Sequence, residues 1–179
     1  MIVSGVKELP ASREAVWSVI NEPEEMAKLM PGVESFELQD ERHWTAKVKV
    51  PLGLGGLKMT INFERLEERP LEFASLRAKG TGVGALMDMT TSFTLSESGG
   101  GTSMDWEADV RIAGPVGAMG QRVLQPIVNQ QVGQVLVTLE KRVAEKSASG
   151  GAEEGIHPAS PEAYEPEPEG PTHSTDASS

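Results

Sequence analysis

The sequence has no cysteine among its 179 residues and few aromatic side chains, only 4%. Without thiols, the chain has no disulfide framework, thiolate metal site or cysteine nucleophile, and their absence fits a reducing cytoplasm. The N-terminal residues MIVSGVKELP lack the basic region and apolar run of a secretory signal. No window approaches the roughly 20 apolar residues that a membrane-spanning helix needs. We therefore expect a soluble, cytoplasmic protein.

Basic side chains are missing from the C-terminal part of the chain. Residues 147–179 carry seven acidic side chains and none that is basic, which accounts for −7 of the net charge of −11 and leaves −4 for residues 1–146. This segment is rich in Ser, Gly, Pro and Glu, so it cannot bury enough apolar surface to offset the entropy of ordering. We expect a folded domain at 1–146 and a disordered acidic tail at 147–179.

The tail is either a solubilising appendage or a segment that docks on a partner around Tyr164. Neither the tail nor the domain has a basic cluster interleaved with aromatic residues, which is the pattern of nucleic-acid-binding surfaces. Nucleic acid is therefore not an expected partner.

Between Trp44 and Ile112, polar and apolar residues alternate in several runs, such as WTAKVKV and LMDMTTSFTL. A period of two is typical of strands with one buried face. The connectors are short and rich in glycine and proline, so neighbouring strands should pair antiparallel. Further strands are expected at 2–9 and 33–38, which gives a sheet of six to seven strands.

Helical patterns flank the predicted sheet. Ser12 is a suitable N-cap for a first helix, and Pro23 opens a second short helix that ends at Pro31 and Gly32. After the last strand, a third segment from Gly114 to about residue 146 repeats apolar residues at helical spacing and would span roughly 45 Å. Pro126 lies inside this segment, where a bend is expected.

This order of elements predicts an α+β helix-grip fold, in which a curved antiparallel sheet wraps a long C-terminal helix. The block AVWSVINEPEEMAKLMPGVESFEL and the Gly-Pro start of the last helix also carry a family resemblance. Over about residues 1–146 the chain resembles the CoxG family of carbon monoxide dehydrogenase subunits, within the START-like, polyketide-cyclase/lipid-transport (SRPBCC) superfamily. The resemblance implies a helix-grip domain whose concave side encloses a hydrophobic cavity.

Function is implied by the same resemblance. Members of this family are similar to accessory proteins of molybdenum-containing dehydrogenases of the carbon monoxide type, which they help to assemble or bring to the membrane. The superfamily holds lipids, sterols, quinones or polyketides. The expected partners are therefore a lipid or isoprenoid quinone and a molybdenum hydroxylase-type dehydrogenase, with peripheral contact at the inner face of the membrane. The acidic segment that follows the last predicted helix is not apolar, so we do not expect it to provide a stable membrane anchor.

The inward positions of the predicted strands and helices are candidates for lining the cavity. They are Trp17, Met30, Met59, Ile61, Phe63, Phe73, Met87, Met89, Phe93, Trp106, Val110, Met119, Val123 and Ile127. Methionine adapts to irregular or variable contents, so the many methionines fit a lipophilic cavity, but they fit the plain filling of a solid core equally well. Arg77 and Thr91 are the candidate polar groups of the cavity; the alternative for Arg77 is a position in water at the end of the sheet.

The stretch KGTGVGAL contains Gly80 and Gly82 in a pattern that resembles a dinucleotide-binding loop. That loop requires a helix after it, because the helix N-terminus binds the pyrophosphate, whereas alternating strand residues follow Ala85. We interpret the stretch as a hairpin turn near the cavity mouth, with Gly80, Gly82 and Gly84 as a candidate lid.

Catalytic chemistry has few candidates. His43 is the only histidine of the predicted domain, and no histidine pair at metal spacing or nucleophilic serine motif is present. We expect no catalytic residues, no metal and no cofactor, and thus a non-catalytic carrier of a hydrophobic ligand. Two alternatives remain open at this point: a protein-interaction module with a solid core, and a cyclase or hydrolase with an unidentified polar group in the cavity.

Overall fold

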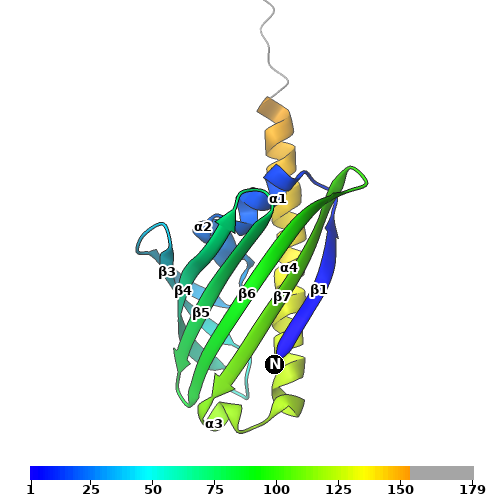
Figure 1. The fold of residues 1–179 in the computed structure, drawn as a ribbon. Helices are drawn as coiled ribbons and strands as arrows, with labels where there is room; N and C mark the ends of the chain where they lie inside the picture. The colour runs from blue at the N-terminus through cyan, green and yellow to red at the C-terminus, as the bar shows by residue number, and fades with distance from the viewer. Residues whose placement is uncertain (154–179) are drawn as a thin grey trace, which may run out of the picture.

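The computed structural model describes residues 1–153, with side chains as far as residue 149. One sheet of seven antiparallel strands curves around a long helix (Figure 1). The strands are β1 (Ile2–Leu9), β2 (Val33–Leu38), β3 (His43–Val50), β4 (Leu57–Arg69), β5 (Phe73–Gly82), β6 (Ala85–Ser98) and β7 (Gly101–Ala113). The helices are α1 (Arg13–Ile20), α2 (Pro23–Leu29), α3 (Gly114–Gly117) and α4 (Gln121–Glu153). The predicted helix-grip fold is confirmed.

The strand order is β1-β7-β6-β5-β4-β3-β2, so β2 to β7 form a meander and β1 adds to its far edge. The registers bring three connections to one end of the sheet, because Val50 pairs with Leu57, Gly82 with Ala85, and Leu86 with Ala113. Helix α3 follows at this end, which we call the α3 end. The opposite end, where α1 and α2 lie, is called the α2 end (Figure 1).

Capping and turn residues determine where α1 and α2 begin and end between β1 and β2. The Ser12 hydroxyl accepts a hydrogen bond from Ala15 N (3.3 Å), and Pro23 occupies the first turn of α2. Gly32 has a φ of +76°, and a Cβ there would overlap the carbonyl oxygen of Lys49 on β3. Only glycine therefore lets the chain leave α2 so close to the sheet.

The C-terminal helical segment differs from the prediction in two ways. It is interrupted at residues 118–120, where Gly120 has a φ of +81°, whereas Pro126 lies within α4. Helix α4 also continues seven residues past residue 146, as far as Glu153. The remainder of the predicted tail, residues 154–179, lies outside the described residues.

Packing between α4 and the sheet is dense near the α2 end. Leu139 and Val143 of α4 are almost fully buried against Val16 and Val19 of α1 and Met104 of β7. A second cluster of buried residues covers β3, β4 and β5 around Trp44 and Phe63, whose rings stack with centroids 5.5 Å apart. The middle of α4 packs less closely on the sheet, and the cavity lies there.

Candidate ligand-binding cavity

A cavity of about 300 Å³ lies between the concave face of the sheet and α4. It extends from Ile20 and Leu139 near the α2 end to Leu52 and Val116 at the α3 end, and it is only partly enclosed. Its volume is at the lower end of the range of about 300–1,000 Å³ that is typical of small-molecule sites. The wall is almost wholly apolar, as in sites for hydrophobic ligands.

Nine of the fourteen predicted lining residues lie on the wall, together with Thr91. They are Met30, Met59, Phe63, Met87, Met89, Phe93, Trp106, Val110 and Ile127. Those that belong to strands point to the concave face of the sheet, because every second side chain of a strand points to the same face. Their contact with a ligand stays a prediction.

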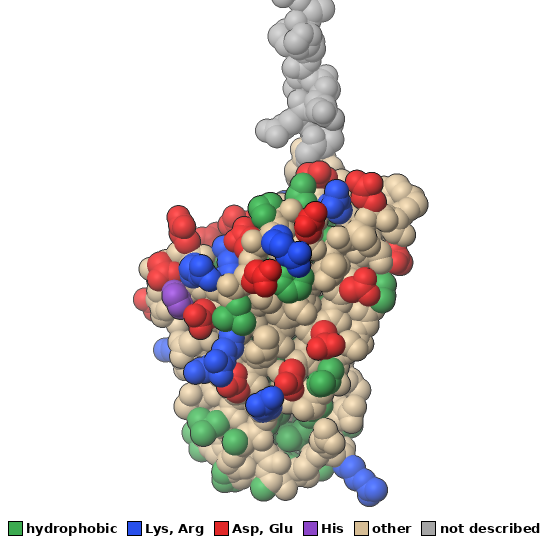
Figure 2. Space-filling model, viewed as in Figure 1, with side chains coloured by type: hydrophobic (Ala, Val, Ile, Leu, Met, Phe, Trp, Pro, Cys, Tyr) green, Lys and Arg blue, Asp and Glu red, His purple; other side chains and the backbone are tan. Residues whose placement is uncertain are grey.

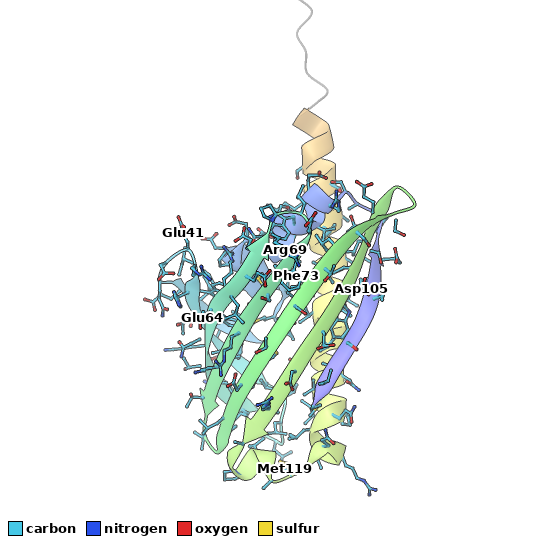
Figure 3. All side chains as sticks on the ribbon, viewed as in Figure 1. Glu41, Glu64, Arg69, Phe73, Asp105 and Met119 are labelled. Atoms are coloured by element: carbon cyan, nitrogen blue, oxygen red, sulfur yellow. The ribbon has the colours of Figure 1, made fainter. Side chains whose placement is uncertain are left out.

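The other five predicted lining residues are Trp17, Ile61, Phe73, Met119 and Val123. Trp17 packs against the core cluster of α1 and α4, and Ile61 is buried within the β3–β5 cluster. Met119 and Val123 are exposed at the α3 end, where Figure 3 labels Met119. These positions follow the apolar pattern of the chain, but they lie outside the cavity wall.

The prediction for β5 placed the wrong face of the strand inward. Ala74, Leu76, Ala78 and Gly80 are its buried residues, so Phe73 and Arg77 lie on the outer face of the sheet. The Arg69 guanidinium lies 4.7 Å from the centroid of the Phe73 ring, and Figure 3 labels both residues. Small inner residues explain the error, because the large Phe73 dominated the apolar pattern.

Arg77 is consequently not a polar group of the cavity. Its Nε donates a hydrogen bond to Asp88 Oδ1 on the neighbouring strand β6, over 2.9 Å. This hydrogen bond holds the pKa of the Asp88 carboxyl below its usual value. The pair is an exposed cross-strand contact on the outer face.

The three glycines of KGTGVGAL do not lie together in one mobile loop that could act as a lid. Gly80 and Gly82 are residues of β5 paired to β4, and a Cβ on Gly80 would lie 2.8 Å from the Met59 methyl group. Gly84 belongs to the two-residue turn into β6, and its carbonyl accepts a hydrogen bond from Val116 N of α3 (2.9 Å). A Cβ on Gly82 would lie 2.8 Å from the backbone carbonyl oxygen of Lys58, so glycine is required there for close approach of the strands, and α3 anchors the turn.

Helix α2 and its C-cap residue line the cavity at the α2 end with Met26, Leu29 and Met30. Its buried Glu25 accepts hydrogen bonds from Arg142 Nε of α4 (3.0 Å) and from Lys28 Nζ (2.9 Å). Burial raises the pKa of the Glu25 carboxyl, but the hydrogen bonds from Arg142 and Lys28 outweigh it, so the pKa is lowered overall. We call these contacts the Glu25 clamp.

Replacing Glu25 by Gln should lower the free energy of unfolding at pH 7 by about 2 kcal/mol. This is less than the roughly 3–5 kcal/mol for breaking a fully buried pair, because the Arg142 side chain keeps 27% exposure. Urea unfolding measures the loss. The control Glu145→Gln removes a solvent-exposed partner of the same Arg142 and should cost at most about 0.5 kcal/mol.

The effect of Glu25→Gln depends on pH. Because the folded-state pKa of Glu25 lies below its ordinary value of 4.5, its contribution to stability is present above that pH. The contribution is lost as the pH falls through the folded-state pKa. The difference between wild type and Glu25→Gln should therefore shrink below pH 4.5, and a difference that stays constant down to acid pH would contradict the clamp.

Four side chains on the wall carry polar groups that can form hydrogen bonds, namely Trp44, Thr91, Trp106 and Gln131. Thr91 Oγ1 donates to the carbonyl oxygen of Glu107 (2.8 Å), whereas Trp44 Nε1 and Gln131 Nε2 are buried without a partner among the described residues. None of the wall residues is ionisable. The cavity therefore offers shape and a few neutral hydrogen-bonding groups, but no acid or base.

The sequence prediction missed Gln131 because a glutamine on a long helix is ordinarily a solvent-facing residue. The spacing along the helix could have identified it. Gln131 lies four residues after Ile127 and four before Val135, so all three residues are on the same side of the helix. Met26, Trp44 and Met104 also lie on the wall outside the predicted set.

Residues 1–149 contain no group of three or more His, Asp or Glu side chains placed to hold a metal ion. Within the described part of the chain, no helix combines the length and the apolar character needed to cross a membrane.

Similar folds occur in several solved bacterial structures. A conserved protein from Geobacillus kaustophilus superposes with a TM-score of 0.75 at 22% identity, covering 81% of this chain and 96% of that one. A START superfamily protein from Mycobacterium smegmatis has a TM-score of 0.62 at 16% identity, covering 80% and 97%. A protein from Thermus thermophilus also has a TM-score of 0.62, at 18% identity, covering 82% and 99%. These likenesses show the START-like fold.

Family membership comes from the sequence. No curated protein matches the chain significantly. The sequence profile of one family, however, matches residues 5–144, which include β2 to β7, the greater part of β1 and most of α4. The chain therefore belongs to the CoxG family, which is named after the G subunit of carbon monoxide dehydrogenase.

Proposed function

We propose that this protein is a non-catalytic carrier that binds a lipid or isoprenoid quinone between α4 and the sheet. The observation that carries the proposal is the cavity itself, which is apolar, partly open and lined by six of the eight methionines. Methionine side chains change shape easily, so such a wall accommodates a flexible or variable hydrophobic molecule. A solid core, as in the interaction-module alternative, would not leave this volume.

The wall chemistry supports binding over catalysis. General acid–base or nucleophilic catalysis needs titratable or activated groups beside the reacting atoms. The wall offers two indoles, a hydroxyl whose hydrogen is already donated, and an amide. Those groups orient a ligand, but none of them moves a proton readily at neutral pH.

The partner in this proposal is a molybdenum-containing oxidoreductase of the carbon monoxide dehydrogenase type. Support comes from membership in a family named after a component of that enzyme. A carrier of a hydrophobic molecule would serve such an enzyme in assembly, in membrane recruitment or in the supply of an electron acceptor.

Exchange with a membrane is proposed to occur at the α3 end, where the cavity wall reaches loop residue Leu52 and Val116 of α3. Exposed apolar side chains gather there, and we call Leu54, Val83, Leu86 and Met119 the apolar rim. Figure 2 shows apolar side chains around this end, below the charged outer face of the sheet. In residues 51–56, 83–86 and 114–124, Arg122 is the sole ionisable residue, so these segments contain no carboxylate that would repel an anionic lipid surface.

Solvent extraction of the purified full chain tests the carrier function. We expect a neutral lipid or quinone in the extract at a substantial fraction of the molar amount of protein. Native mass spectrometry should show the same added mass on the intact protein. An unrelated acidic protein purified from the same host controls for carry-over of membrane lipid. If this protein yields no more than that control and fails to bind added lipid or quinone, the proposal is wrong.

A further inference from the structure

Two buried N–H donors on the cavity wall have no hydrogen-bond partner among the described residues. They are Nε1 of Trp44, a residue with 1% exposure on β3, and Nε2 of Gln131 on α4. Almost all buried polar groups in folded proteins are paired, because an unpaired group has lost its hydrogen bond to water without replacement. Two such groups on one apolar wall therefore need an explanation.

Packing explains the Trp44 ring but not its N–H group. The ring stacks on Phe63 with an angle of 6° between the planes, and the Arg65 guanidinium lies 6.0 Å from its centroid. Phenylalanine would make the same stacking contact without burying a donor. Gln131 lies between Ile127 and Val135 on the wall, where leucine would fit the apolar surroundings equally well.

The rest of the wall limits what the two donors can bind. It has no lysine, arginine or histidine, so an ionised carboxylate or phosphate inside the cavity would lack a counter-ion and would be strongly disfavoured. Thr91 already donates its hydrogen to the Glu107 carbonyl and offers only lone pairs. Neutral oxygen acceptors match the donors best.

We propose, building on the carrier function above, that Trp44 and Gln131 recognise the head of the ligand by donating hydrogen bonds to neutral acceptor oxygens. Carbonyl groups of a quinone or an ester have this chemistry, whereas the ionised carboxylate of a free fatty acid does not. The donors come from different walls of the cavity, β3 and α4, so acceptors on separate edges of one head group suit them. The apolar remainder of the ligand follows the methionine-lined part of the wall.

Binding of two matched probes tests this recognition. One is an alkylated 1,4-naphthoquinone, and the other is the alkylated naphthalene that lacks both carbonyl groups. The readout is the ratio of their dissociation constants in the full chain, because this ratio cancels changes in cavity shape. Gln131→Leu should shift the ratio about fivefold towards the naphthalene, the size expected for one lost hydrogen bond. Trp44→Phe should shift it in the same direction.

Two matched controls keep the test specific. Gln134→Leu makes the same change at an exposed position of α4, and Trp17→Phe makes the same change off the wall. Both should leave the ratio at the wild-type value. If Gln131→Leu also leaves it unchanged while both probes still bind, the recognition proposal is overturned and the carrier function stands. If neither probe binds the wild-type chain, both proposals fail.

Discussion

Ala108→Phe should weaken binding of a hydrophobic ligand about 100-fold while leaving the fold at least as stable as the wild type. Ala108 lies on β7 at the cavity wall with 6% exposure, beside Val110 and opposite the α4 residues Val128 and Val132. A benzyl group there would occupy space that the ligand needs. The expected loss corresponds to about 2.7 kcal/mol of binding free energy.

The stability of this variant distinguishes a cavity from a solid core. Adding bulk to a well-packed core costs about 1–3 kcal/mol, whereas filling a cavity adds contacts. Ala46→Phe is the matched control, because Ala46 is buried on the same face of the sheet but lies outside the cavity wall. Calorimetry should show a loss of stability for Ala46→Phe and none for Ala108→Phe. Equal losses, with ligand binding retained in Ala108→Phe, would show that the core is solid.

Changing Leu54, Val83 and Met119 of the apolar rim to serine should slow ligand transfer between vesicles at least about tenfold. The three side chains are exposed at the α3 end, and full burial of one such side chain contributes about 1.5–3 kcal/mol. Partial burial in a lipid surface is thus enough for a tenfold effect. Affinity in solution should stay at the wild-type value, because none of the three lies on the cavity wall.

Transfer of a fluorescent lipid from anionic donor vesicles measures the rim effect. A matched control changes Leu38, Leu66 and Val137 to serine, since these residues are also exposed and apolar but lie away from the α3 end. The control should transfer ligand at the wild-type rate. If both triple variants slow transfer equally, general loss of surface hydrophobicity is responsible and the rim is not the docking surface.

The two ends of the cavity differ in a way that fits entry at the α3 end. At the α2 end, the Glu25 clamp joins α2 to α4, and α1 adds further buried contacts. At the α3 end, the wall reaches loop residue Leu52 and the four-residue helix α3. Fewer interactions have to break there for a ligand to pass.

Much of this architecture could be predicted because strand alternation is a strong local signal. The inward faces of β4 and β6, with Met59 and Met89, follow directly from it. The inward face of β5 could not be assigned, because Ala74 and Ala78 are too small to mark a buried face beside the large Phe73. Family resemblance, in contrast, identified the fold independently of any single strand.

The cavity itself could not be deduced from the sequence. A packed core and a cavity wall use the same apolar residues, and only the separation between α4 and the sheet distinguishes them. Gln131 was missed for a related reason, since its burial depends on which side of α4 the sheet covers. These are properties of long-range packing, which the local pattern of residues does not contain.

Binding between α4 and the sheet is tested most directly by a titration followed by NMR of methionine methyl groups in the full chain. A bound naphthoquinone should shift the resonances of the wall methionines, which are Met26, Met30, Met59, Met87, Met89 and Met104. Met119, exposed at the α3 end and off the wall, should stay within the noise once the ligand is seated. Shifts confined to Met119, or no shifts at a saturating concentration, would show that the ligand does not enter the space between α4 and the sheet.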